Sequence, residues 1–118
     1  MISATIQMKY LQQSIGIRLG GLSADLARIS SFADIPDPQA VETMLEESRG
    51  FIEWSAPDLL PDRVEDAARL VEIQLELTRW HRVWNEAQHD PALWARLSEQ
   101  ARAWSDEILG MSGLVDQE

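Results

Sequence analysis

Residues 61–88 read PDRVEDAARLVEIQLELTRWHRVWNEAQ, and this stretch decides the fold class. It opens with a proline, which favours the first turn of a helix, and nothing after it interrupts one. Two apolar stripes follow it at helical spacing. One stripe holds Val64, Ala68, Val71 and Leu75, and the other holds Leu70, Ile73, Leu77, Trp80, Trp84 and Ala87. At 100° per residue the stripes lie on nearly opposite sides, so we expect a long helix that is central in a bundle or shared with a second chain.

The chain on both sides of this stretch divides at prolines. Breaks at Asp34–Pro38, Ala56–Pro61 and His89–Pro91 leave four segments. The segments from Pro38 to about Trp54 and from Pro91 to Gly110 each carry an apolar face at helical spacing. Four helices with short connections predict an all-α, four-helix up-down bundle whose first and third helices are long.

The length of 118 residues fits one domain with one core. We expect a single helical-bundle domain over residues 1–110. Gly110 is the predicted C-cap of the last helix. Residues 111–118 are then a flexible C-terminal tail.

The first segment is the most ambiguous. Ile15, Leu19, Leu22, Leu26, Ile29 and Ala33 alternate at spacings of four and three, which predicts the seam of a helix. Residues 2–10 instead alternate apolar with polar, so helix, a strand paired with a second copy, and disorder stay open there. Gly16, Gly20 and Gly21 indicate either the close approach of another helix or a break between two helices.

Composition and charge exclude several kinds of chemistry. The chain has no Cys, which rules out disulfides, thiolate metal sites and Cys nucleophiles. Twenty acidic against ten basic residues give a net charge of −10, which disfavours a nucleic-acid partner. We expect no membrane partner, because no stretch approaches the length of a membrane span. The first residues lack the pattern of a secretory signal, so the expected location is cytoplasmic.

The five Trp residues are unusually many for a bundle of this size. Trp and Arg are enriched at interface hot spots, although a core filled with Trp is the alternative interpretation. The candidate interface or ligand-binding residues are Trp80, Trp84, Trp104, Trp94, Arg82 and His81.

Four carboxylates form a weaker candidate for a hard cation. Glu42, Glu46, Glu72 and Glu76 lie four residues apart on the second and third predicted helices. Arg69 and Arg79 lie three residues away from Glu72 and Glu76, which indicates surface ion pairs instead.

No complete catalytic motif emerges, and we expect no cofactor. The favoured interpretation is a non-catalytic helical protein-interaction module, acting as an adaptor, a regulator or an assembly subunit. Its expected partners are itself, as a homodimer, and in addition another protein. The alternatives are a metal-dependent hydrolase of a small phosphorylated substrate and a bundle that binds an apolar or planar ligand between Trp side chains.

Overall fold

The computed structural model describes residues 4–32 and 37–114, and this part of the chain is all-helical. The elements in order are α1 (Ala4–Leu11), α2 (Ile15–Ser31), α3 (Pro38–Ser55), the short 3-10 helix η1 (Ala56–Leu59), α4 (Val64–Ala87) and α5 (Pro91–Ser112). The prediction of an all-α protein is confirmed. The predicted count of four helices is wrong, because the described residues form five α-helices.

The fifth helix arises because the long first helix is divided in two. Ser14 begins α2 as its N-cap, and its hydroxyl oxygen accepts a hydrogen bond from the Ile17 amide at 3.4 Å. Residues 4–11 form the separate helix α1, so strand and disorder are wrong for these residues. Residues 2 and 3 lie outside the described residues.

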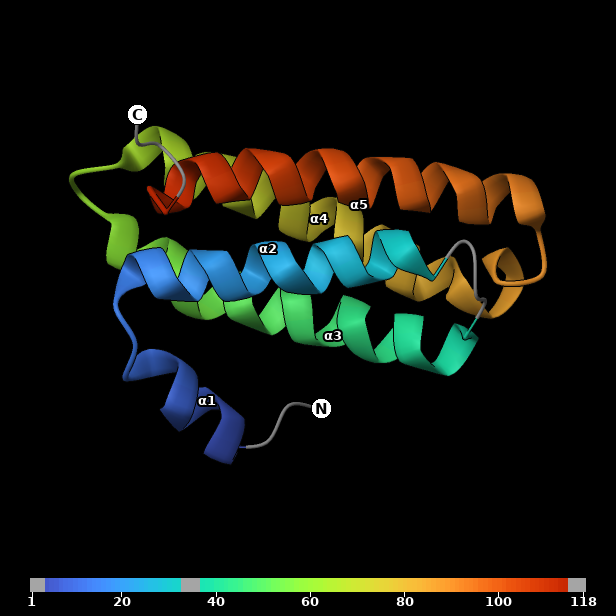
Figure 1. Ribbon diagram of the computed structural model, residues 1–118, viewed down its shortest axis with the longest axis horizontal. Coiled ribbons are helices and arrows are strands. Elements are labelled where there is room, and N and C mark those ends of the chain that lie inside the picture. Colours follow the sequence, from blue (N-terminus) through green and yellow to red (C-terminus); the bar gives the residue numbers. More distant parts are fainter. Residues whose placement is uncertain (1–3, 33–36, 115–118) are drawn as a thin grey trace.

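The four longer helices lie side by side (Figure 1), and consecutive ones run in opposite directions. Helix α2 packs mainly along α5 and also against α3, which in turn packs along α4. Helix α1 lies outside this group and contacts α3. The molecule measures 41 × 35 × 22 Å.

The proline breaks begin two helices as predicted. Asp37 and Asp90 are the N-caps of α3 and α5, and their carboxylates accept hydrogen bonds from the Ala40 and Ala92 amides. A proline in the first turn follows each cap, where its missing amide proton costs nothing. The third break differs, because α4 begins only at Val64.

The end of α5 corrects the predicted cap at Gly110. The helix continues to Ser112 and ends at Gly113, whose φ of 75° is left-handed. Met111 packs against the core, and the Arg63 guanidinium donates to the Met111 carbonyl oxygen at 2.7 Å. These contacts hold the extra turn in place. Of the predicted tail, residues 115–118 lie outside the described residues.

Small residues let α2 and α5 approach closely. In antiparallel order Gly16 meets Ser112, Ser23 meets Ser105, and Ser30 meets Ser98. Ser23 and Ser105 each donate to the other's carbonyl oxygen at 2.8 Å. A Cβ on Gly16 would lie 2.9 Å from the Ser112 carbonyl oxygen, so the predicted close approach is confirmed there. The break that the glycines also allowed occurs earlier, before Ser14.

No helix of the described residues combines the length and the apolar character needed to cross a membrane.

Candidate interaction surface

Helix α4 has two apolar faces, and of these one is buried by the other described residues. Its longer stripe is buried in the bundle, as predicted: Leu70, Ile73, Leu77, Trp80, Trp84 and Ala87. The opposite stripe, Val64, Ala68, Val71 and Leu75, is exposed, and its three larger side chains are 56%, 45% and 55% exposed in that order. We call this second set the outer stripe. Contiguous exposed apolar side chains mark interaction sites more often than single ones do.

A shallow apolar groove lies beside the outer stripe, along Val64, Ala68 and Val71. Helix η1 and the turn after it contribute Ala56, Pro57 and Leu60 to one wall, and α4 contributes the other. The groove has a volume of about 410 Å³ and is lined almost entirely by carbon. It widens the apolar surface beyond α4 itself, and the sequence pattern of α4 does not reveal it.

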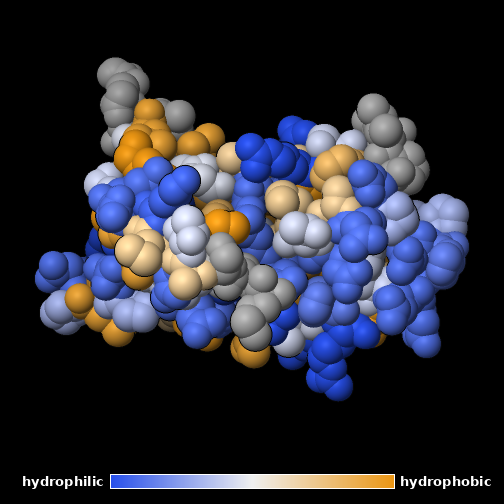
Figure 2. Space-filling model, turned by 90° about the horizontal axis from the view of Figure 1, so that it is seen from below, coloured by the Kyte–Doolittle hydropathy of each residue, from blue (hydrophilic) through white to orange (hydrophobic). Residues whose placement is uncertain are grey.

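Exposed apolar side chains gather at one end of the bundle. Figure 2 shows the face over α1 and α3, where hydrophobic groups lie toward the end that carries α1 and the opposite half is mostly hydrophilic. Leu60 and Val64 belong to this end, and so do Leu11, Ile17 and Leu114. The outer stripe therefore starts at the apolar end of the molecule and runs toward the polar end.

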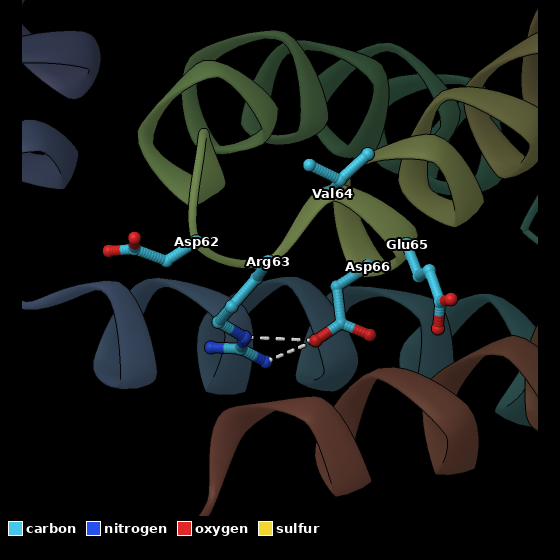
Figure 3. A pocket seen from close by; sticks show the side chains of 5 residues that line it. All are labelled: Asp62, Arg63, Val64, Glu65 and Asp66. Atoms are coloured by element: carbon cyan, nitrogen blue, oxygen red, sulfur yellow. Dashed lines mark hydrogen bonds and ion pairs between the residues drawn. The ribbon is translucent and has the colours of Figure 1, made fainter.

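The outer stripe begins next to acidic side chains. Figure 3 shows this region, a depression of about 350 Å³ at the start of α4. Arg63 donates twice to Asp66, at 2.9 and 2.6 Å, whereas Asp62 and Glu65 point away from that pair. In the part of the chain that the structure describes, no cation pairs with Asp62 or Glu65. We call these two residues the acidic end of the stripe.

The stripe is followed by basic side chains. Arg79 and Arg82 lie one and two turns beyond Leu75, and both are exposed. Arg79 pairs with Glu76 at 2.6 Å. No carboxylate of the described residues pairs with Arg82, which continues the line of the stripe. We call Arg79 and Arg82 the basic end. The surface is thus apolar in the middle and carries opposite charges at its two ends.

The four candidate Trp side chains lie inside the bundle instead of on this surface. Trp80, Trp84, Trp94 and Trp104 are all at most 9% exposed. Trp84 and Trp94 contact each other edge to face with ring centroids 5.0 Å apart. The Trp84 and Trp80 indoles donate to the Pro38 carbonyl and to the Gln100 side chain. Their role in binding is not tested by these contacts, and it stays a prediction.

Trp80 borders a depression between α4 and α5. This depression has a volume of about 250 Å³, and Leu93 and Gln100 line it from α5. Trp84 and Trp104 do not line it. A ligand site formed jointly by Trp80, Trp84 and Trp104 stays a prediction.

His81 lies between two helices and is half-buried. Arg49 of α3 donates to His81 Nδ1 at 3.2 Å, which leaves the ring proton on Nε2. That nitrogen lies 3.8 Å from a Glu42 carboxylate oxygen. His81 thus helps to hold α3 against α4.

The four glutamates are not gathered into one cluster among the described residues. Among residues 4–32 and 37–114, no three His, Asp or Glu side chains lie close enough together to hold a metal ion. Glu72 and Glu76 instead pair with Arg69 and Arg79, as the sequence spacing indicated. Glu42 lies beside His81, and Glu46 is half-buried.

Sequence reasoning missed one buried acid. Asp25 of α2 is 3% exposed, and Arg28 donates to its Oδ1 at 2.7 Å, whereas its Oδ2 has no hydrogen-bond partner among the described groups. The pKa of Asp25 is raised from 3.8 to about 8. Burial is the largest cause, and the nearby Glu47 carboxyl of α3 is the second, whereas Arg28 lowers the pKa. A carboxyl next to Leu22 and Leu26, both in the predicted seam, was the available signal.

A second missed cluster joins α1 to the bundle. Tyr10 stacks on Phe51 with ring centroids 4.1 Å apart, and its hydroxyl donates to the Arg18 carbonyl oxygen at 2.9 Å. The buried Arg18 side chain pairs with Asp58 of η1 and donates to the Trp54 carbonyl oxygen. These contacts are between parts of one chain, so the cluster positions α1 and η1.

Comparison of the chain with protein-family models, with curated proteins and with solved structures gave no match.

Proposed function

We propose that the protein is a helical, non-catalytic interaction module, serving as an adaptor, a regulator or an assembly subunit, and that it self-associates through the outer stripe of α4. The observation that carries this proposal is the exposed apolar surface formed by the stripe and its groove. Burying such a surface releases water from it. The free energy of association becomes more favourable by about 25 cal/mol per Å² of apolar surface buried. A cytoplasmic location and binding of another protein belong to the same proposal.

The polar clusters support a binding role over a catalytic one. Tyr10 with Arg18, Ser23 with Ser105, and Arg49 with His81 each join two helices. Their hydrogen-bonding groups are thus engaged within the fold instead of converging on a cavity. The apolar side chains of the outer stripe, in contrast, are exposed and accessible to a partner.

A second copy is the occupant we propose, because the surface carries both charges that a self-complementary interface requires. Its acidic and basic ends lie at opposite ends of one apolar stripe. The basic end of one molecule can therefore pair with the acidic end of its copy. The patch is small, and each copy has a charge of −10. We therefore expect a weak dimer, with a dissociation constant on the order of micromolar or higher.

Sedimentation velocity over a range of concentrations tests this proposal. Wild type is expected to show a monomer–dimer equilibrium. Leu75→Glu places a charge on the stripe and is expected to leave only monomer, because an unpaired charge cannot be desolvated at an apolar interface. Leu75 is 55% exposed, so the fold should tolerate the change.

The matched control is Ile17→Glu, since Ile17 is 47% exposed but lies on α2 and belongs neither to the stripe nor to the lining of its groove. This variant is expected to dimerise like wild type. Circular dichroism spectra should be the same for all three proteins. A wild type that stays monomeric at every concentration, or equal dimerisation of Leu75→Glu, would overturn the proposal.

A further inference from the structure

The spacing of the outer stripe has a symmetry that specifies how two copies pair. Val64, Ala68, Val71 and Leu75 are separated by four, three and four residues, a pattern that reads the same in both directions. We infer that two copies pack their α4 helices antiparallel, about a two-fold axis that passes between Ala68 and Val71. This inference rests on the proposed self-association and adds its geometry.

In this arrangement each stripe residue meets another stripe residue of the second copy. Val64 of one copy lies opposite Leu75 of the other, and Ala68 lies opposite Val71. The small side chain of Ala68 next to the axis lets the two helix backbones approach closely. The pairing is reciprocal, as a two-fold interface requires.

The groove offers space for Leu75, which is the largest side chain of the stripe. Its lining includes Leu60 from the turn after η1, and Val64, Ala68 and Val71 of the stripe. Antiparallel packing brings Leu75 of the second copy level with Val64 and therefore next to the groove. Each copy then places one Leu75 at the groove of the other copy and receives one at its own.

The charges distinguish antiparallel from parallel packing. In a parallel pair Arg82 would face Arg82 of the second copy, because it continues the line of the stripe, and like charges would meet. In an antiparallel pair about this axis Arg79 and Arg82 lie level with Leu60 and Pro57 of the other copy, just beyond its acidic end. Side chains on a helix lean toward its N-terminus, so Arg79 and Arg82 lean back toward Asp62 and Glu65 of the other copy.

Disulfide crosslinking tests the geometry directly, because the chain has no Cys of its own. Single Cys residues are introduced at Val64, Ala68 or Leu75 and the proteins are oxidised with diamide. With a rise of 1.5 Å per residue, the two copies of residue 68 are only about 5 Å apart along the helix axis, but the two copies of residue 75 are about 16 Å apart. A disulfide spans Cα atoms at most about 7 Å apart.

The expected result is that Ala68→Cys crosslinks to itself, whereas Val64→Cys and Leu75→Cys alone do not. A mixture of Val64→Cys and Leu75→Cys proteins is expected to crosslink at least tenfold more than either protein alone. Parallel packing predicts the reverse, because each of the three variants would then crosslink to its own copy. That outcome would overturn the antiparallel geometry.

Charge reversal provides a second measurement. Arg82→Glu is expected to weaken dimerisation roughly fivefold, and adding Asp62→Arg is expected to restore most of the loss, because Asp62 is the nearer of the two acids in this register. The control is Arg102→Glu, which changes an exposed charge on α5 and should have little effect.

The experiments distinguish an incorrect antiparallel geometry from an absence of self-association. If Leu75→Glu abolishes dimerisation but neither Ala68→Cys nor the mixture crosslinks, the geometry is wrong and self-association through α4 stands. If the wild type shows no dimer at all, both are wrong.

Discussion

Asp25 places a carboxyl group in an interior that disfavours its charge. Its pKa is raised mainly by burial, so the folded protein binds a proton that the unfolded chain releases. The stabilising contribution of Asp25 is therefore complete below about pH 4 and is lost as the pH rises to about 8 and above.

Asp25→Asn is expected to remove this dependence, because the amide keeps an acceptor for Arg28 and cannot ionise. Relative to wild type, the free energy of unfolding of this variant should increase by on the order of 4 kcal/mol between pH 5 and pH 9, because about three pH units separate pH 5 from the folded pKa. Urea unfolding at several pH values measures the difference. Asp106→Asn, at an exposed position of α5, is the control, and its difference from wild type should stay constant. A constant difference for Asp25→Asn would contradict the assignment.

Single residues also show where sequence and structure agree. Asp37 and Asp90 are helix caps because each precedes a proline that opens a helix, and this signal is local. Asp25 and Arg18 are buried because of helices distant in the sequence. No local pattern contains that information.

Between elements, the packing of α2 on α5 depends on glycine at one position and not at another. A Cβ on Gly16 would contact the Ser112 carbonyl oxygen, whereas a Cβ on Gly21 would meet nothing within 4 Å. We expect Gly16→Ala to destabilise the protein by about 1 kcal/mol, since the steric cost outweighs the gain in helix propensity. Gly21→Ala should instead stabilise it by about 0.5–1 kcal/mol. Thermal unfolding of both variants gives the comparison, and the same sign for both would refute this account.

The heptad spacing of Gly16, Ser23 and Ser30 was visible in the sequence, as was that of Ser98, Ser105 and Ser112. What could not be predicted was that the two sets face each other. That depends on which helices become neighbours, because every helix of the bundle has a compatible apolar face.

For the whole molecule, net charge opposes the proposed dimer. Two copies with charge −10 and centres roughly 25 Å apart repel by about 7 kcal/mol in 0.01 M salt but by only about 1 kcal/mol in 0.15 M salt. The few ion pairs at the stripe ends contribute about 1 kcal/mol each or less.

Dimerisation is therefore expected to strengthen as salt rises from 0.01 to 0.15 M, despite the ion pairs across the interface. Sedimentation velocity of wild type at the two salt concentrations measures this. Ile17→Glu should follow the same trend. Stronger association at the lower salt concentration would mean that the ion pairs outweigh the net repulsion.

The sequence by itself determined the helical class, two proline-linked caps and the two faces of α4, because helical periodicity and capping depend on residues within one or two turns. It left open whether the second face of α4 is covered within the bundle or by a second chain. Tertiary structure alone decided the division of the first helix, the burial of Asp25 and the neighbours of the Trp rings. It also decided the groove beside the stripe, because the wall formed by η1 is placed by contacts between segments far apart in sequence.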